Sequence, residues 1–305
     1  MDPITLGAGA LVRAADSTAQ EAGKLSANLL GRLLGPSADV IGEDWAQRLR
    51  QRNLARLLAK ADKRTDGSPE PGYTTPRVAA AAFESAQYAD DEIVSEYLSG
   101  VLASSRAPDG GTDAGVPWAS LISRLSSDQL RLHFLVYSSA RSPLIADVLT
   151  STATIRGDEV NSIHGQDILL PLDELVDRMQ LGAQVNTRFS DAIDGLMRED
   201  LISSSYSYGE LAHVESSSVK HGGRLDAPFD RGLRVGVTIH GIRLFIWGLG
   251  RGGSNVNEYL SPGADMGLAD PEPGLEPLKN TVLYARSWRD AIEGELPAGI
   301  IPPQP

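Results

Sequence analysis

The chain has 305 residues, of which 41% are hydrophobic and 6% aromatic, and this length suffices for two modules that each bury a core. Its 40 acidic residues outnumber its 28 lysines and arginines, so the formal net charge is −12. Such a surface repels nucleic-acid backbones and anionic membranes unless its positive charge is gathered locally. The absence of cysteine excludes disulfides, thiolate metal sites and a cysteine nucleophile.

The sequence carries no signal for export or for a membrane span. It opens without a basic segment followed by a small-residue cleavage site. It also contains no run of about 18 apolar residues, the length needed for a conventional spanning helix. We therefore expect a cytoplasmic protein.

The first part of the chain has the periodicity of helices. Apolar residues recur at steps of three and four through residues 8–34, which predicts an amphipathic helix ended by Gly35-Pro36. A second helix is expected over residues 39–64. Shorter helices are expected from Pro76, then across residues 93–102, before residue 125, and from Ser127 to Tyr137. Residues 1–140 therefore predict a helical body.

After residue 140 the pattern changes. Two short helices are expected over residues 172–180 and 188–198, and alternating apolar residues predict a strand over 233–239, followed by a helix. This order predicts a winged helix-turn-helix-like α+β module over residues 141–255, with a long Ser/Gly-rich wing between Leu201 and Ile239. Residues 256–305 form a Pro/Gly-rich extension with room for one helix over 278–292. The predicted fold class is mainly α.

The winged module alone would suggest a DNA reader. Its second helix, however, carries four carboxylates against two arginines: Arg188, Asp191, Asp194, Arg198, Glu199 and Asp200. Carboxylates on a recognition helix oppose docking, because such a helix passes close to phosphates. The wing offers cations that could grip a backbone: Lys220, His221, Arg224, Arg231 and Arg234. We expect the module to serve protein contacts, and DNA binding remains an alternative.

Two charge runs are prominent in the helical body. One helix is basic, with Arg48, Arg50, Arg52, Arg56, Lys60, Lys63 and Arg64. A later helix is acidic, with Glu84, Asp90, Asp91, Glu92 and Glu96. Three interpretations are open: solvated helix faces, pairing of the two runs within one chain or between two copies, and a nucleic-acid patch on the basic helix.

The first helix contains Gly23, Gly31 and Gly35 among its small residues. Small residues four apart let helices approach closely, as in membrane helix dimers. A membrane-active effector is therefore a second alternative, although charged residues interrupt the apolar surface. The other interpretation is an amphipathic helix that docks on the body.

Known catalytic motifs are missing from the sequence. It contains no phosphate loop, no His-Glu-x-x-His and no Gly-x-Ser-x-Gly motif. The glycines of residues 248–253 follow a predicted helix, which is the wrong context for a dinucleotide loop. His133 and His164 stand alone and are interpreted as surface or capped histidines. We expect no catalytic residues, no metal site and no cofactor.

Three runs resemble one protein family. The first run is residues 52–61, Arg-Asn-Leu-Ala-Arg-Leu-Leu-Ala-Lys-Ala. The second, residues 88–103, has an acidic start before an aromatic residue and a Leu/Ala face, and the third, residues 118–128, is a helix and the cap that follows it. All three are similar to the abortive-infection alpha family. The resemblance implies a role in bacterial phage resistance and supplies no active residues.

Together these observations predict a non-enzymatic phage-defence protein that acts through protein–protein contacts, with self-association among the options. The alternatives are a DNA-binding winged-helix regulator and a membrane-active effector. The candidate partner- or nucleic-acid-binding residues are Arg48, Arg52, Arg56, Lys60, Lys220, Arg224, Arg231 and Arg234.

Overall fold

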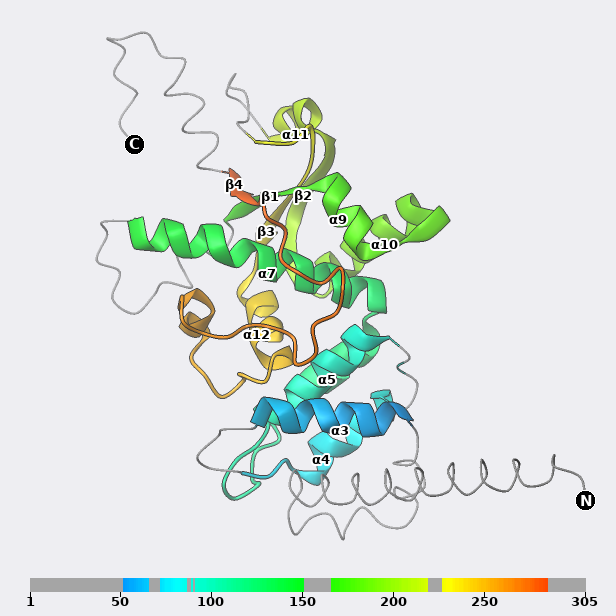
Figure 1. The fold of residues 1–305 in the computed structure, drawn as a ribbon, viewed down its shortest axis with the longest axis vertical. Coiled ribbons are helices and arrows are strands. Elements are labelled where there is room, and N and C mark those ends of the chain that lie inside the picture. Colours follow the sequence, from blue (N-terminus) through cyan, green and yellow to red (C-terminus); the bar gives the residue numbers. More distant parts are fainter. Residues whose placement is uncertain are drawn as a thin grey trace, which may run out of the picture. The chain divides into compact units, whose positions relative to one another are not determined.

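The computed structural model describes residues 52–65, 72–86, 89, 91–150, 166–218 and 227–284 (Figure 1). Within these ranges the chain is mainly helical, with nine α-helices and a four-stranded antiparallel sheet. A helix with the length and hydropathy needed to cross a membrane is not found there. The predicted amphipathic helix over residues 8–34 lies outside the described residues.

The chain divides into two compact units that are not continuous in sequence. Unit 1 contains the residues up to Leu125 together with Ile246–Ser254 and Gly267–Asp270, and unit 2 contains the rest. This division differs from the predicted segments 1–140, 141–255 and 256–305, because two late segments cluster with the N-terminal helices. Periodicity reports only local structure, so it does not reveal such returns of the chain.

Among its described residues, unit 1 contains four short helices: α3 (Arg52–Thr65), α4 (Pro76–Ala86), α5 (Glu92–Ser104) and α6 (Val116–Arg124). Helix α4 begins at a proline, whose fixed φ suits the first turn. Asp91 caps α5, since its side chain accepts a hydrogen bond from the Ile93 N–H at 3.2 Å. These four helices confirm the predictions from periodicity.

Gly100 lies at a close approach of two backbone segments of unit 1. A Cβ placed on Gly100 would lie 1.8 Å from the backbone oxygen of Gly248, and one on Gly248 would lie 2.5 Å from the ring of Tyr97. Helix α5 and the end of helix α12 (Ile239–Gly248) therefore meet backbone to backbone.

Unit 2 has the following elements: α7 (Ser127–Thr150), β1 (Asp167–Pro171), α9 (Leu172–Met179), η2 (Gly182–Gln184), α10 (Val185–Arg198), β2 (Ile202–Glu210), α11 (Leu211–Ser218), β3 (Arg231–Val237), most of α12, η3 (Val256–Leu260) and β4 (Val282–Leu283). The strands run antiparallel in the order β2-β3-β1-β4, and Leu170 pairs with Leu233. Asp200 has φ +55°, which turns the chain from α10 into β2.

Several elements of unit 2 differ from the sequence-based expectations. Helix α7 continues past Tyr137 to Thr150 with Pro143 inside it. Residues of α7 are buried on several sides of the helix, so it lacks the polar face by which periodicity recognises a helix. Strand β1 and helix α11 were not predicted. Val282–Leu283 is a strand where a helix over 278–292 was expected, and residues 285–292 of that segment lie outside the description.

The hydroxyl of Tyr137 joins three parts of unit 2. It donates a hydrogen bond to the Leu201 carbonyl at 2.7 Å and accepts one from the Thr238 N–H at 3.0 Å. The Thr238 hydroxyl in turn accepts from the Gly241 N–H at 3.0 Å, which caps α12. Burial raises the pKa of Tyr137 to about 12, so the hydroxyl stays protonated and able to donate.

His133 lies beside this junction and is fully buried. Of the two interpretations from the sequence, a surface or a capped histidine, the surface one is therefore wrong. Its Nε2 lies 3.1 Å from the Gly241 carbonyl oxygen. Burial lowers the pKa of His133 to about 3, so the ring is neutral and donates to that carbonyl. The neighbouring ring of Tyr137 lies 4.6 Å away, centre to centre. His133 is therefore a core residue held by a backbone contact.

We expect Gly100→Ala to destabilise unit 1 by about 1–3 kcal/mol or more, because its methyl group would collide with backbone that cannot move aside cheaply. The measurement is urea unfolding followed by tryptophan fluorescence, to which the Trp118–Trp247 pair of unit 1 contributes. Gly253→Ala is the control, since nothing lies within 4 Å of its added Cβ. Equal midpoints for the two variants would contradict the close approach.

Candidate functional site

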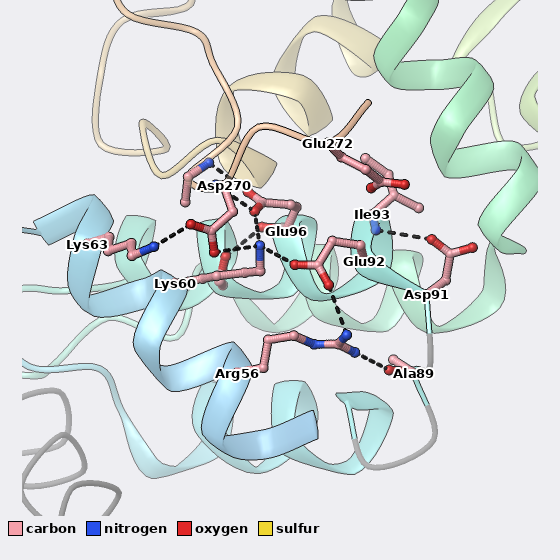
Figure 2. Close-up of polar contacts among 12 residues, drawn as sticks. Arg56, Lys60, Lys63, Ala89, Asp91, Glu92, Ile93, Glu96, Asp270 and Glu272 are labelled. Carbon is pink, nitrogen blue, oxygen red and sulfur yellow. Dashed lines mark hydrogen bonds and ion pairs between the residues drawn. The ribbon is translucent and has the colours of Figure 1, made fainter. Parts of the chain in front are cut away.

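Helices α3 and α5 of unit 1 carry oppositely charged rows with the same spacing. Arg56, Lys60 and Arg64 follow one another at steps of four on α3, and Glu92 and Glu96 do the same on α5. A step of four keeps side chains on one helix face. The two helices pack against each other, so the rows meet (Figure 2).

Lys60 is the central cation of this cluster. Its ammonium contacts the carboxylates of Glu92 and Glu96 and lies 3.1 Å from Asp270 (Figure 2). The side chain of Lys60 is only 1% exposed and that of Glu96 is fully buried. An ammonium in this position needs all three carboxylates, since a buried charge is costly unless it is paired.

Glu96 is the central anion. One of its oxygens accepts a hydrogen bond from the Ala269 N–H at 2.9 Å, and the other accepts from the Asp270 N–H at 3.1 Å. Arg64 completes the set by contacting Glu96 and donating to the Leu249 carbonyl at 2.9 Å. The carboxylate therefore fixes the segment Gly267–Asp270 against the helices of unit 1.

The protonation states follow from these contacts. Burial by itself lowers the pKa of Lys60, but hydrogen bonds to Glu92 and Glu96 outweigh it and raise the pKa above 10.5. Lys63 holds the pKa of Asp270 below its usual value, with help from Lys60. Both groups are thus charged at neutral pH, and the cluster is a set of ion pairs.

Glu92, Glu96 and Asp270 each place a carboxylate oxygen within 4.8 Å of the others, which is close enough for shared ligation of a metal ion. The Lys60 ammonium, however, contacts all three carboxylates. Together with Arg56, Lys63 and Arg64, which each pair with one of the three, it supplies the positive charge that such a trio needs. The ion pairs therefore account for the geometry without a metal.

The basic residues of α3 that the sequence proposed for partner binding differ in their exposure and contacts. Lys60 does not reach the surface, so it is not available to a partner, which corrects that prediction. Arg56 is partly exposed but binds Glu92 at 2.8 Å and the Ala89 carbonyl at 3.0 Å. Arg48 and the side chain of Arg52 lie outside the description. Internal pairing of the two charge runs is the interpretation that the contacts support.

The wing cations are not gathered into one patch within the described residues. Arg231 is half exposed and lies 2.6 Å from Asp173. Arg234 is buried, 3.8 Å from Asp167 and over the ring of Tyr284, which corrects its assignment as a partner-binding residue. Lys220 and Arg224 lie outside the description.

A second surface of note was not found from the sequence. It is formed by β2 and α10 of unit 2, and we call it the tyrosine face: Tyr206, Tyr208, Ser190, Asp191 and Asp194. The Tyr206 hydroxyl donates to Asp194 at 2.8 Å, and the Tyr208 hydroxyl lies 3.1 Å from that of Ser190. The alternation of tyrosines in β2 was the available signal, but the serine-rich sequence concealed the strand.

One arginine of α10 is removed from this surface. Arg188 donates two hydrogen bonds to the Asp128 carboxylate, at 2.8 and 2.7 Å, and a third to the Leu181 carbonyl. This bidentate pair holds the start of α10 against the start of α7. The exposed charges left on α10 are Asp191, Asp194 and Arg198.

Comparison with known proteins finds no match of this chain to a family model, to a curated protein or to a solved structure. The resemblance to the abortive-infection alpha family therefore rests on the three sequence runs alone.

Replacing Lys60 with Met is expected to destabilise the protein by about 3–5 kcal/mol, because the fully buried carboxylate of Glu96 loses one of its two cations and keeps only Arg64. Lys63→Met is the matched control. Its side chain is 56% exposed and pairs with Asp270 near water, so about 0–1 kcal/mol should be lost. Urea unfolding of both variants makes the comparison. Similar losses would mean that burial of Lys60 is not what matters.

Proposed function

We propose that this protein is a non-enzymatic, defence-associated interaction protein, and that unit 2 is a winged helix-turn-helix-like module used for protein contacts. The observation that supports the use of unit 2 for protein contacts is the charge on α10. Its exposed charges are Asp191, Asp194 and Arg198, so carboxylates outnumber cations there, and Arg188 is tied to Asp128.

The order of elements supports the winged-helix comparison. Helix α7 is followed by β1, helices α9 and α10, and strands β2 and β3, and β3 pairs with both β1 and β2. The turn from β3 into α12 also has a physical basis, since the Thr238 hydroxyl caps α12 by accepting from the Gly241 N–H. A Cβ on Gly241 would lie 2.0 Å from the Tyr137 hydroxyl, so the turn needs glycine.

Electrostatics favours a protein partner over DNA. In a winged helix that reads DNA, the second helix enters the major groove and passes between phosphates. Two exposed carboxylates there would add repulsion to that of a chain with net charge −12. The described wing arginines do not offset this, because Arg234 is buried and Arg231 lies beside Asp173.

The defence role comes from the family resemblance. The runs 52–61, 88–103 and 118–128 fall largely on α3, α5 and α6, three of the helices of unit 1. The matched run on α3 includes Lys60, and the one on α5 includes Glu92 and Glu96. The likeness therefore concerns residues that hold unit 1 together, and it supports a shared helical body.

We expect the protein to show no salt-dependent binding to duplex DNA, with any dissociation constant above about 10⁻⁴ M at physiological salt, the weak end of non-specific binding. The measurement is fluorescence anisotropy of a labelled duplex titrated at several salt concentrations. Tight binding that weakens steeply with salt, and is lost on changing Arg224 and Arg231 to Ala, would establish the DNA-binding regulator instead.

Expression of the protein in a susceptible bacterial host is expected to reduce phage plaque numbers. Lys60→Met should protect less than Lys63→Met, because loss of stability lowers the amount of folded protein several-fold. Plaque counts with immunoblots of protein level check both statements. Unchanged plaque numbers over a range of phages, with the protein present at a normal level, would remove the defence role.

A further inference from the structure

The tyrosine face presents two rings held side by side. Tyr206 and Tyr208 occupy alternate positions of β2, so both project to the same side of the sheet. Their planes differ by only 6° and their centres are 6.3 Å apart. Phe189 of α10 supports Tyr208 edge-on at 5.4 Å. Tyr208 is 37% exposed and is the exposed large hydrophobic side chain of the described residues.

Helix α10 holds both rings in place through their hydroxyls. The bond to Asp194 is the main cause that raises the pKa of Tyr206 to about 12. The phenol therefore stays neutral and keeps donating to Asp194. Rings fixed in this way lose little freedom when a ligand stacks on them, which favours binding.

The surroundings of the rings are acidic. Asp191 and Asp194 are three residues apart on α10, so they share its exposed face. Only one oxygen of Asp194 is used by Tyr206. Arg198 lies one turn beyond Asp194 on the same face. Glu210 is exposed at the end of β2 and lies 3.7 Å from Arg231. Carboxylates thus outnumber cations beside the aromatic rings.

We propose that the tyrosine face is the docking site for an arginine side chain on an exposed segment of a partner protein. The proposal rests on the proposed function and names the chemistry of its partner. A guanidinium stacks on an aromatic ring and donates parallel hydrogen bonds to a carboxylate. Tyr208 offers the ring and Asp194 the carboxylate. Tyr206 links the two, because its hydroxyl donates to Asp194 and its ring centre lies 6.3 Å from that of Tyr208.

Other occupants fit less well. A lysine ammonium is a point charge that neither stacks as a plane nor forms a bidentate pair. A nucleic-acid base could stack on Tyr208, but its phosphates would approach Asp191 and Asp194. A neutral apolar segment would leave the carboxylates without partners.

The test uses the full-length protein and three fluorescent peptides that differ only in carrying arginine, lysine or citrulline at the same positions. Citrulline keeps the planar shape of arginine without its charge. We expect anisotropy titrations at about 0.15 M salt, where charges are screened beyond roughly 8 Å, to rank the affinities arginine, then lysine, then citrulline.

Variants locate the site. Tyr208→Leu keeps an apolar side chain but removes the ring, and about a two- to fivefold loss of affinity for the arginine peptide is expected. Asp194→Asn should weaken binding by a similar factor. Tyr208→Phe keeps the ring and should retain most of the affinity, even if Tyr208→Leu folds poorly. Glu84→Gln removes an exposed carboxylate from α4 and should leave binding unchanged.

Equal affinity for the arginine and citrulline peptides, or an equal loss in Glu84→Gln and Asp194→Asn, would overturn the proposal. So would a single-stranded oligonucleotide that binds and depends on Tyr208. The duplex DNA titration distinguishes failure of this docking site from failure of the proposed protein-contact role. If neither duplex nor arginine peptide binds, only this docking site fails. If duplex binds, the protein-contact role of unit 2 fails as well.

Discussion

A carboxylate that leaves water must have its charge compensated, and in unit 1 this constraint converges on Glu96. Its oxygens receive Lys60, Arg64 and two backbone N–H groups of the segment Gly267–Asp270. Helices α3 and α5 therefore need one relative register, in which the two charge rows align. The same contacts hold a segment more than 170 residues away in sequence. Removing one partner leaves a buried charge, so the cluster acts as a unit.

Unit 2 solves a related problem with neutral groups. The Tyr137 hydroxyl and Thr238 satisfy backbone groups at the ends of α10 and β3, where the chain turns and regular hydrogen bonds stop. Gly241 lets these atoms approach. In each unit a few buried polar side chains fix the positions of elements that apolar packing alone would leave free to slide.

Where burial is one-sided, the sequence predicted the elements well: helices α3, α4 and α6 were expected because apolar residues face one side of each. Helix α5 was expected from its apolar residues although residues 95–102 are all buried. Pro76 and Asp91 mark the starts of α4 and α5. The long course of α7 was missed because it is buried on several sides. Strand β1 is a short apolar run that periodicity cannot distinguish from a helix. For the charge cluster, the opposite signs of the two charge runs indicated that α3 and α5 could pair. The contribution of Asp270 could not be predicted, because the segment that carries it meets α3 and α5 only in the folded chain and no local sequence pattern indicates that contact.

The same pairing determines which surface remains for a partner. Each internal ion pair removes one cation and one anion from the surface. The net charge of the surface is therefore unchanged, but fewer cations remain there to form a positive patch. Lys60, Arg188 and Arg234 are all directed to carboxylates of their own unit. The acidic excess stays on the outside, and on α10 it lies beside two ordered aromatic rings. A partner selected by this surface has to bring positive charge, and a planar cation satisfies both the rings and the carboxylates. The rings and the carboxylates all belong to unit 2, so they indicate a cationic protein partner without any contribution from unit 1.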